Sequence, residues 1–260
     1  MIRIEECSKT FGDGTTARVR ALRDVSLEIA RQEFIVVIGT NGSGKSTLLN
    51  IIAGTVRPDA GRIVIDGMDV TARKDFMRAG LIGRVFQNPF SGTAPTMTVA
   101  ENLRLANLRG ERKGLRLGLS RREVALFRER AAELGMGLED RMETPIGNLS
   151  GGQRQALTLL MATLRKPRIL LLDEHTAALD PRSAEQVMLL TDRIITTHSL
   201  TALMVTHDMD EATRHGTRLL MMYEGAIALD ATGERKQEMT AERLLHEFAE
   251  RRKSNATPGG

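Results

Sequence analysis

The chain has 260 residues, of which 41% are hydrophobic, and its formal net charge is +4. This length allows one large domain or one domain with a substantial insertion, whereas so small a charge excludes the strongly basic surface of a dedicated nucleic-acid binder. Cys7 has no second cysteine with which to form a disulfide, which is typical of a reducing cytosol, and we find neither a signal peptide nor an apolar run of the ~20 residues that span a bilayer.

The first third of the chain has the apolar periodicity of strands, followed by a glycine-rich loop and a helix. Gly54 ends that helix. RIVIDGMDV, at 62–70, is predicted to form a hairpin with Asp66 and Gly67 in its turn. The expected elements before this hairpin are strands at 1–5, 25–29 and 34–38, a loop at 39–44 and a helix at 45–53.

From about residue 88 to 166, helix signals replace the strand pattern. Thr98 and Glu101 form a capping box before one helix, and 121–134 is a second expected helix. RGERKGLRLGLSRR, at 109–122, is basic and interrupted by glycines. We expect a solvated link there, with contact to anionic lipid headgroups as the alternative.

After Pro167 the alternation of strands and helices resumes. Continuous apolar strands are expected at 169–172 and 202–205, as a parallel sheet buried on both faces requires, and 219–229 is a further β-like stretch. The end of the chain is predicted to hold one short helix, 240–251, and a frayed tail. Three apolar residues are expected on one face of this helix: Leu244, Leu245 and Phe248.

The segment GTNGSGKST fits the G-x-x-x-x-G-K-[ST] pattern and lies between an expected strand and an expected helix. Its backbone N–H groups converge on phosphate oxygens. Lys45 can reach the β- and γ-phosphates, and the hydroxyl of Ser46 can bind Mg²⁺. The pattern therefore predicts a nucleoside triphosphate site at Gly39, Thr40, Asn41, Gly42, Ser43, Gly44, Lys45, Ser46 and Thr47.

Two carboxylates end the apolar run ILLLDE. Asp173 is expected to face Mg²⁺, and Glu174 can hold the attacking water as a general base. VTHD places His207 at the carboxyl edge of the same sheet, where α/β folds bind ligands. Gln87 follows the apolar RVF. Taken singly, each of these is also an ordinary polar residue at a strand end.

LSGGQRQALTLLMATL begins another helix at a serine and two glycines. Such a start leaves backbone N–H groups free to face an anion. The chain therefore has two candidate phosphate sites but only one P-loop lysine, Lys45.

The order of P-loop, Gln87, LSGGQ, ILLLDE, AALD and His207 resembles that of the nucleotide-binding subunits of ABC transporters, over about 1–230. The resemblance implies a head-to-tail dimer with each ATP between the P-loop of one copy and the LSGGQ of the other. The second phosphate site would then bind the partner's ATP. Its residues would be Ser150, Gly151, Gly152 and Gln153.

The resemblance also implies individual roles. Phe11 resembles the aromatic residue that stacks on adenine, with a place in the core as the alternative. Gln87 resembles the residue that contacts Mg²⁺ and water and links the site to the helical insert. Asp180 lies in the loop that reads the opposite site, and His207 would hold the γ-phosphate. The catalytic residues implied are thus Glu174, His207, Gln87 and Lys45, and the Mg²⁺ ligands are Ser46, Gln87 and Asp173.

Three positions depart from the family pattern. His175 replaces the usual proline after the catalytic glutamate, so we expect a less rigid backbone there. Thr40 replaces a common proline, and the segment at 31–33 lacks a usual glycine. None of these changes removes a group that the chemistry needs.

The family fold is α/β, a RecA-like P-loop NTPase core with an amino-terminal antiparallel β-subdomain, interrupted by a helical subdomain. We expect the nucleotide-binding domain at 1–232, its helical subdomain at about 88–166, and only a short helix and tail, without a regulatory domain, at 233–260. The resemblance implies an ATPase that needs ATP and Mg²⁺ and lies peripherally on the cytoplasmic face of the inner membrane. Its expected partners are a second copy, permease subunits and an extracytoplasmic solute-binding protein, without nucleic acid.

Import of small solutes is the function that the compact chain favours. DEHTAALDP, FQNPFSGTAPTMT and LMMYEGAIALD resemble poorly characterised uptake ATPases, some of tryptophan/tyrosine type, which suggests amino acids or related solutes. The alternatives are a stand-alone ATPase for export or lipid extraction, an ATPase in DNA repair or translation, and a P-loop kinase or GTPase. The last class would leave LSGGQ and His207 unexplained.

Overall fold

The computed structural model of the protein describes residues 1–12, 18–110 and 118–256. One sheet is antiparallel, in the order β2-β1-β4-β5. Its strands are β1 (Ile2–Phe11), β2 (Val19–Ile29), β4 (Ala60–Ile65) and β5 (Met68–Asp69). The expected hairpin is confirmed, because β4 and β5 pair around Asp66 and Gly67, which both have positive φ.

Strands β1 and β2 extend well past the bounds expected from the sequence because both contain irregular positions. Glu6 and Asp24 each have a φ of 49°, and the pairing register shifts on both sides of the Cys7–Val25 pair. A β-bulge places two residues of one strand opposite a single residue of the neighbouring strand, which interrupts the alternation of apolar and polar residues. The sequence pattern therefore ends before the strands do.

The second sheet has the order β10-β9-β3-β8-β7-β6 and is parallel except for β10. Its strands are β3 (Phe34–Gly39), β6 (Ile82–Val85), β7 (Ile169–Asp173), β8 (Ala202–Val205), β9 (Arg218–Tyr223) and β10 (Ala226–Thr232). The continuous apolar strands predicted from the sequence are thus confirmed as neighbours in one buried sheet. The β-like stretch at 219–229 is a hairpin that turns at Glu224 and Gly225.

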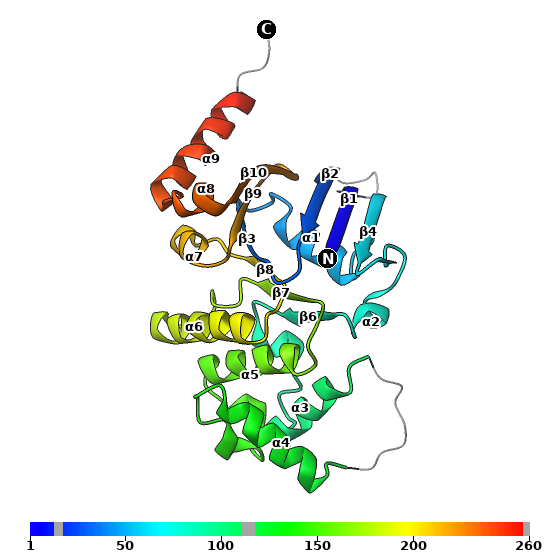
Figure 1. Ribbon diagram of the computed structural model, residues 1–260, viewed down its shortest axis with the longest axis vertical. Helices are drawn as coiled ribbons and strands as arrows, with labels where there is room; N and C mark the ends of the chain where they lie inside the picture. Colours follow the sequence, from blue (N-terminus) through cyan, green and yellow to red (C-terminus); the bar gives the residue numbers. More distant parts are fainter. Residues whose placement is uncertain (13–17, 111–117, 257–260) are drawn as a thin grey trace.

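Helices surround this sheet, and those drawn in green extend beyond it at the end opposite the antiparallel sheet (Figure 1). They are α1 (Lys45–Ala53), α2 (Asp75–Arg78), α3 (Val99–Asn107), α4 (Arg121–Ala132), α5 (Gly151–Thr163), α6 (Pro181–Thr197), α7 (Met209–Arg214), α8 (Gly233–Gln237) and α9 (Ala241–Ala256). The 3₁₀ turns are η1 (Pro89–Gly92), η2 (Glu139–Arg141) and η3 (Ile146–Asn148). The sequence segment expected to be helical therefore holds α3, α4 and α5.

The ends of these helices follow from local chemistry. The predicted capping box of Thr98 and Glu101 is present at α3. Helix α4 ends two residues before the predicted Leu134, because the N–H groups of Leu134 and Gly135 bond to carbonyls only three residues back.

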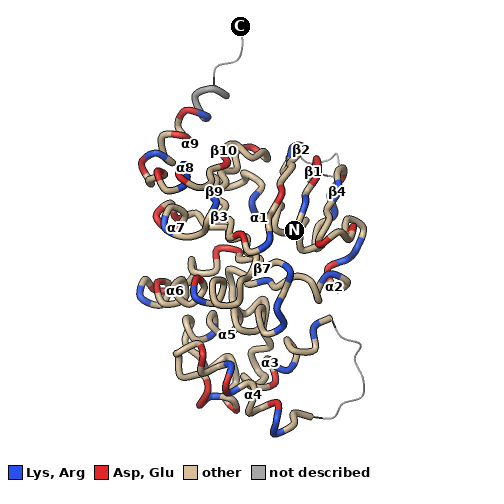
Figure 2. Tube along the Cα trace, viewed as in Figure 1, with Lys and Arg blue, Asp and Glu red and all other residues tan. Residues whose placement is uncertain are grey.

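Both acidic and basic residues occur along α4 and α9, and neither sign of charge covers these helices alone (Figure 2).

The two faces of the parallel sheet belong to different cores. In β3, Ile35 and Val37 pack with α1 and the antiparallel sheet, whereas Val36 and Ile38 pack with the helices on the other face. Successive strand residues point to opposite faces, so burial on both sides requires the unbroken apolar run in β3. This sheet holds the loops at its carboxyl edge in fixed relative positions.

The carboxy-terminal segment differs from its prediction. Leu244 is buried and Phe248 packs against the core, but Leu245 is 57% exposed, because adjacent helical positions point about 100° apart. The helix also runs to Ala256, past the predicted end. Residues 257–260 of the expected tail and 111–117 of the expected basic link lie outside the described residues. In the described part of the chain, no helix has the length and apolar character needed to cross a bilayer.

Candidate functional site

The P-loop lies between β3 and α1, as predicted, and the backbone packs too tightly there for side chains at two glycines. A Cβ on Gly39 would lie 2.4 Å from the Oγ of Ser43, and one on Gly44 would lie 2.3 Å from the carbonyl oxygen of Ala21. Gly44 also has a φ of 102°, which favours glycine. These glycines allow the loop to curl and to direct its N–H groups inward.

Two polar side chains inside the loop have hydrogen-bonding capacity suited to a phosphate. The Nζ of Lys45 donates to the carbonyl oxygens of Gly39 (2.7 Å) and Thr40 (3.1 Å). The Oγ of Ser43 is buried and has no hydrogen-bond partner. Burial lowers the pKa of Lys45, while Glu174 and Asp173 act to raise it. A buried hydroxyl without a partner is costly in free energy, and an anion in the loop would accept a hydrogen bond from it.

Asp173 ends β7 and forms an ion pair across the sheet. An Nη2 of Arg84, in β6, lies 3.3 Å from its Oδ2 and donates to the Oδ1 of Asn50 at 2.8 Å. Burial raises the pKa of Asp173, while Arg84 lowers it and Glu174 raises it further. Asn50 of α1 therefore holds the guanidinium group of Arg84, and Arg84 in turn orients the carboxyl group of Asp173.

Glu174, Gln87 and His207 meet at one point, although they come from three separate segments. The Oε2 of Glu174 lies 3.2 Å from the Nδ1 of His207 and 3.4 Å from the Nε2 of Gln87. Glu174 has a φ of 43°, an uncommon conformation for a residue with a side chain. The strained backbone and the convergence of polar groups are features of functional sites.

The residues expected to bind Mg²⁺ offer oxygen atoms, which this ion prefers: the hydroxyl of Ser46, the carboxylate of Asp173 and the amide oxygen of Gln87. Among the described residues, no cluster of three His, Cys, Asp or Glu side chains is placed to hold a metal ion. Mg²⁺ usually keeps several waters and is bound by one or two carboxylates together with substrate phosphates. The donor set thus fits Mg²⁺ arriving with a nucleotide.

The LSGGQ segment begins α5 as predicted. The Oγ of Ser150 accepts a hydrogen bond from the N–H of Gln153, and the side chain of Gln153 caps Ser150 in return. Ser150 and Gly151 are exposed. The amide of Gln153 also donates to the carbonyl oxygen of Met136. The helix start is therefore rigid, and its exposed face is available to a group from outside the chain.

Asp180 caps α6 beside this helix start. Its carboxylate accepts a hydrogen bond from the N–H of Ser183. Hydrogen bonding to Ser183, first through its side chain and then through its N–H, lowers the pKa of Asp180. A Cβ on Gly152 would lie 3.2 Å from the Oγ of Ser183, and one on Gly151 would lie 3.2 Å from Leu179. The AALD loop and LSGGQ thus form one continuous surface.

Phe11, the candidate for adenine stacking, lies at the end of β1 and is 42% exposed. It pairs with Val19 of β2, and Ala21 of the same strand contacts the P-loop at Gly44. The ammonium group of Lys9 lies 5.5 Å from the ring centroid. The exposed ring rules out the alternative that Phe11 belongs to the core.

The structure shows a contact of His175 that the sequence pattern does not predict. The ring is buried and its Nε2 lies 3.0 Å from the hydroxyl oxygen of Thr191 in α6. Burial lowers the pKa of His175 to about 4. The ring therefore anchors the segment after Glu174 to a helix by tertiary contacts that the sequence pattern does not reveal.

Sequence reasoning missed several residues that support the site. Arg84 donates to Asp173 and is itself held by the Oδ1 of Asn50. The N–H of Gly225 in the β9–β10 turn donates to the carbonyl oxygen of Ser43 at 3.0 Å. The Glu–Gly dipeptide was a usable turn signal. No local signal connects Arg84 with Asp173, because β6 and β7 are separated by the helical segment.

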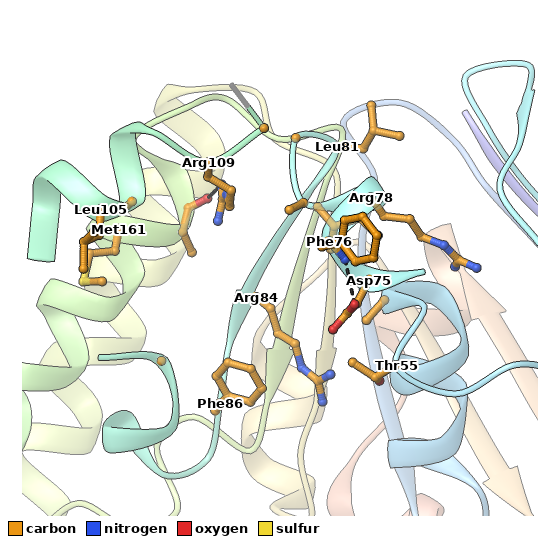
Figure 3. Close-up of a pocket in the computed structure, with 18 of the residues that line it drawn as sticks. Thr55, Asp75, Phe76, Arg78, Leu81, Arg84, Phe86, Leu105, Arg109 and Met161 are labelled. Carbon is orange, nitrogen blue, oxygen red and sulfur yellow. Dashed lines mark hydrogen bonds between the residues drawn. The ribbon is translucent and has the colours of Figure 1, made fainter. Parts of the chain in front are cut away.

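A groove of about 1710 Å³, which we call the α2–α3 groove, lies between α2 and α3 and is also lined by β6 and α5. Phe76, Met77 and Leu105 are 69%, 54% and 51% exposed in it. Figure 3 shows Phe76 on one side, Leu105 on the other, and Arg84 between them. The ring of Phe86 lies 4.6 Å from the guanidinium carbon of Arg84. The groove therefore shares Arg84 with the site at Asp173.

Comparison with known proteins gives consistent similarities over most of the chain. The family model described as "ABC transporter" matches residues 22–177. A tyrosine transport ATP-binding protein of Clostridioides difficile (strain R20291) is 39% identical over 95% of this chain and 98% of its own length. The thiamine import ATP-binding protein ThiQ of Escherichia coli (strain K12) is 37% identical over 78% of this chain and 82% of its own.

A solved structure has the same fold. It is a dimeric, post-hydrolysis state of the ATP-binding cassette MJ0796 bound to ADP and Pi, with a TM-score of 0.75 and 31% sequence identity. It covers 89% of this chain, and this chain covers 98% of it. The P-loop NTPase fold expected from the sequence is thereby confirmed.

Proposed function

The chain belongs to the ABC transporter family of ATP-binding ATPases, and we propose that it is the ATP-hydrolysing subunit of a multi-subunit importer with a separate permease. The observation that carries this proposal is the meeting of Gln87 and His207 on the carboxylate of Glu174 at the edge of a P-loop sheet. A general base, a polar group and a phosphate-binding loop are the parts required to direct water at a terminal phosphate.

In the proposed reaction, Glu174 accepts the proton of the attacking water, and His207 donates a hydrogen bond to the γ-phosphate. Lys45 leaves the carbonyl oxygens of Gly39 and Thr40 and binds the β- and γ-phosphates. Ser46, Asp173 and Gln87 would hold Mg²⁺, which supplies charge neutralisation at the phosphate oxygens. Phe11 would stack on the adenine, for which its exposed ring is available.

We propose that two copies share each site head to tail. Ser150 and Gly151 are exposed at the start of α5, and the polar groups of Ser150 and Gln153 already satisfy each other. A phosphate of the partner's ATP would accept hydrogen bonds from the remaining free N–H groups. Since only the closed dimer provides this contact, ATP would favour closure. The dimeric ADP-bound relative is consistent with this arrangement.

The α2–α3 groove is the proposed docking site for a helical segment of the permease. Its exposed Phe76, Met77 and Leu105 offer apolar surface to such a helix. Arg84 lines the same groove and reaches Asp173. A helix in the groove would therefore lie directly beside the group that orients a catalytic carboxylate, which suits the transfer of movement between subunits.

The finer assignments follow from the same proposal. Residues 1–232 form the nucleotide-binding domain, with a helical subdomain at about 88–166, and 233–260 form the carboxy-terminal helices and tail. The subunit works at the cytoplasmic face of the inner membrane, without nucleic acid and together with a solute-binding protein. Its solute is an amino acid or a related molecule, a choice supported by the tyrosine transport relative.

Reconstitution tests this function. The protein is placed in liposomes together with a candidate permease subunit, and ATP-dependent tyrosine movement is measured for the wild type and for Lys45→Ala. We expect inward transport by the wild type and none by the variant. Outward movement would favour the export alternative, and ATPase stimulation by nucleic acid without any by the permease would favour the non-transport alternative.

A further inference from the structure

One carboxylate outside the proposed reaction joins the two segments that carry Glu174 and His207. The Oε1 of Glu211, in α7, accepts a hydrogen bond from the hydroxyl of Thr176 at 3.0 Å. Its Oε2 accepts another from the hydroxyl of Thr206 at 2.7 Å. Thr176 follows Glu174 by two residues, and Thr206 immediately precedes His207. The two oxygens of Glu211 therefore bind the hydroxyl groups of residues that lie two positions from Glu174 and one position from His207.

The segments joined in this way are largely buried, and one of them is strained. Thr176 and Thr206 are 7% and 4% exposed. Glu174 has a φ of 43°, and such a conformation persists only where surrounding contacts enforce it. Its N–H donates to the carbonyl oxygen of Val205, which fixes the backbone entry to the turn. The hydrogen bond from Thr176 to Glu211 fixes the exit.

Helix α7 gives Glu211 a defined place. Asp208 caps this helix, and its Oδ1 accepts a hydrogen bond from the N–H of Glu211. The hydroxyl oxygen of Thr206 also accepts one from the N–H of Asp208 at 3.1 Å. The hydroxyl of Thr206 thus donates to Glu211 and accepts from Asp208, so residues on both sides of His207 are held by hydrogen bonds.

We propose that Glu211 is a positioning residue for ATP hydrolysis: through the hydroxyls of Thr176 and Thr206, it holds Glu174 and His207 in their mutual geometry. This inference rests on the proposed role of Glu174. Glu211 is not the general base, since both of its oxygens are engaged by hydroxyl groups. It acts on the orientation of the reacting groups and leaves the phosphate-binding P-loop unchanged.

The decisive test separates turnover from nucleotide binding. In Glu211→Ala, kcat should fall on the order of 10- to 100-fold, because small displacements of catalytic groups have effects of this size. The Kd for a fluorescent ATP analogue with Mg²⁺, measured without turnover, should stay within about twofold, since the P-loop is untouched. Glu242→Ala, at an exposed position of α9, is the matched control and should match the wild type in both measurements.

Paired threonine variants show whether the hydroxyls carry the effect. Thr176→Ser and Thr206→Ser keep the hydroxyl and should retain most of the turnover, whereas Thr176→Val and Thr206→Val should lose it. The loss from Thr206→Val should nearly vanish when Glu211 is already alanine, because residues that act through one network are not additive. A threonine needed only for packing would show the reverse order, with valine better tolerated than serine.

The proposal is overturned if Glu211→Ala keeps kcat within about twofold, if kcat and the Kd for nucleotide worsen in parallel, or if serine fails to rescue. Melting temperatures of all variants identify those that do not fold, and the Thr→Ser variants decide the matter if Glu211→Ala is among them. Loss of turnover in Glu174→Gln, together with normal turnover in Glu211→Ala, would refute this inference alone. Normal turnover in Glu174→Gln would refute the proposed function.

Discussion

Glu174 and His207 contact each other through the Oε2 and Nδ1 atoms, 3.2 Å apart, although they are 33 positions apart in the chain. They are adjacent because β7 and β8 pair in parallel, with Asp173 opposite Val205. Both strands end at the same edge of the sheet, so the residues that follow them share one site.

Glu174→Gln should bind ATP normally and lose hydrolysis on the order of a hundredfold or more, because an amide cannot accept the proton of water. Phosphate release measures the loss, and size-exclusion chromatography in ATP should show a trapped dimer. Lys45→Ala is the control, since it should lose binding as well. A Glu174→Gln variant that remained monomeric at saturating ATP would contradict the shared-site proposal.

Sharing of the site can be tested directly with two inactive variants. Lys45→Ala removes the cation of one phosphate site, and Ser150→Arg blocks the exposed start of α5. Mixed dimers should contain one site with an intact P-loop and an intact LSGGQ, so ATP hydrolysis should return on mixing. Crosslinking of position 150 to nucleotide held by the P-loop of the same chain would refute sharing.

The ion pair of Arg84 and Asp173 predicts a pH-dependent loss of stability. Their side chains are 14% and 18% exposed, so Arg84→Met leaves a carboxylate without its cation and should cost about 1–3 kcal/mol in the free energy of unfolding at neutral pH. Urea unfolding of the wild type and the variant measures this difference in free energy. Arg62→Met, which breaks a solvent-exposed ion pair with Asp69, should cost less than Arg84→Met, because water screens exposed charges.

The sign of the pH effect follows from protonation. The pKa of Asp173 is already raised by burial, and loss of Arg84 raises it further. A carboxyl group whose pKa is higher in the folded state loses folded-state stability as pH rises through that range. The deficit of Arg84→Met should therefore be small at about pH 4 and larger at about pH 7. An equal deficit at both pH values would show that the guanidinium acts only by packing.

Local patterns in the sequence sufficed for the elements that determine the fold. The P-loop, the apolar strand before Asp173 and the Thr98 capping box depend on neighbouring residues, and each was confirmed. The bulges at Glu6 and Asp24 interrupt the alternation on which strand bounds rest.

The contacts that orient the site could not be predicted from local sequence patterns. Arg84 is 89 residues from its partner Asp173. His175 is 16 residues from Thr191, and Glu211 is 35 residues from Thr176. They meet only through the order of strands in the parallel sheet and the packing of α6 and α7. For His175, the departure from the family pattern is visible in the sequence, whereas the burial of its ring and its contact with Thr191 are not.

His175 offers a test of this anchoring through acid stability. Its pKa is about 4 in the folded protein, lowered from 6.5 mainly by burial, so the unfolded chain binds the proton more readily between these values. The free energy of unfolding should therefore have its full value above about pH 6.5. It should fall as the pH drops towards 4, by up to about 3 kcal/mol, since each pKa unit corresponds to about 1.36 kcal/mol. Denaturant unfolding across this range measures the slope.

The variant His175→Pro, which restores the residue usual in the family, should reduce that slope, because proline has no proton to gain. It should also lose the hydrogen bond to Thr191, which contributes about 1 kcal/mol at neutral pH. His246→Gln removes an exposed histidine of α9 and should leave the slope unchanged. If His175→Pro kept the full pH dependence between about pH 4 and 6.5, another group would have to be responsible, and the buried ring would be an anchor without an effect on titration.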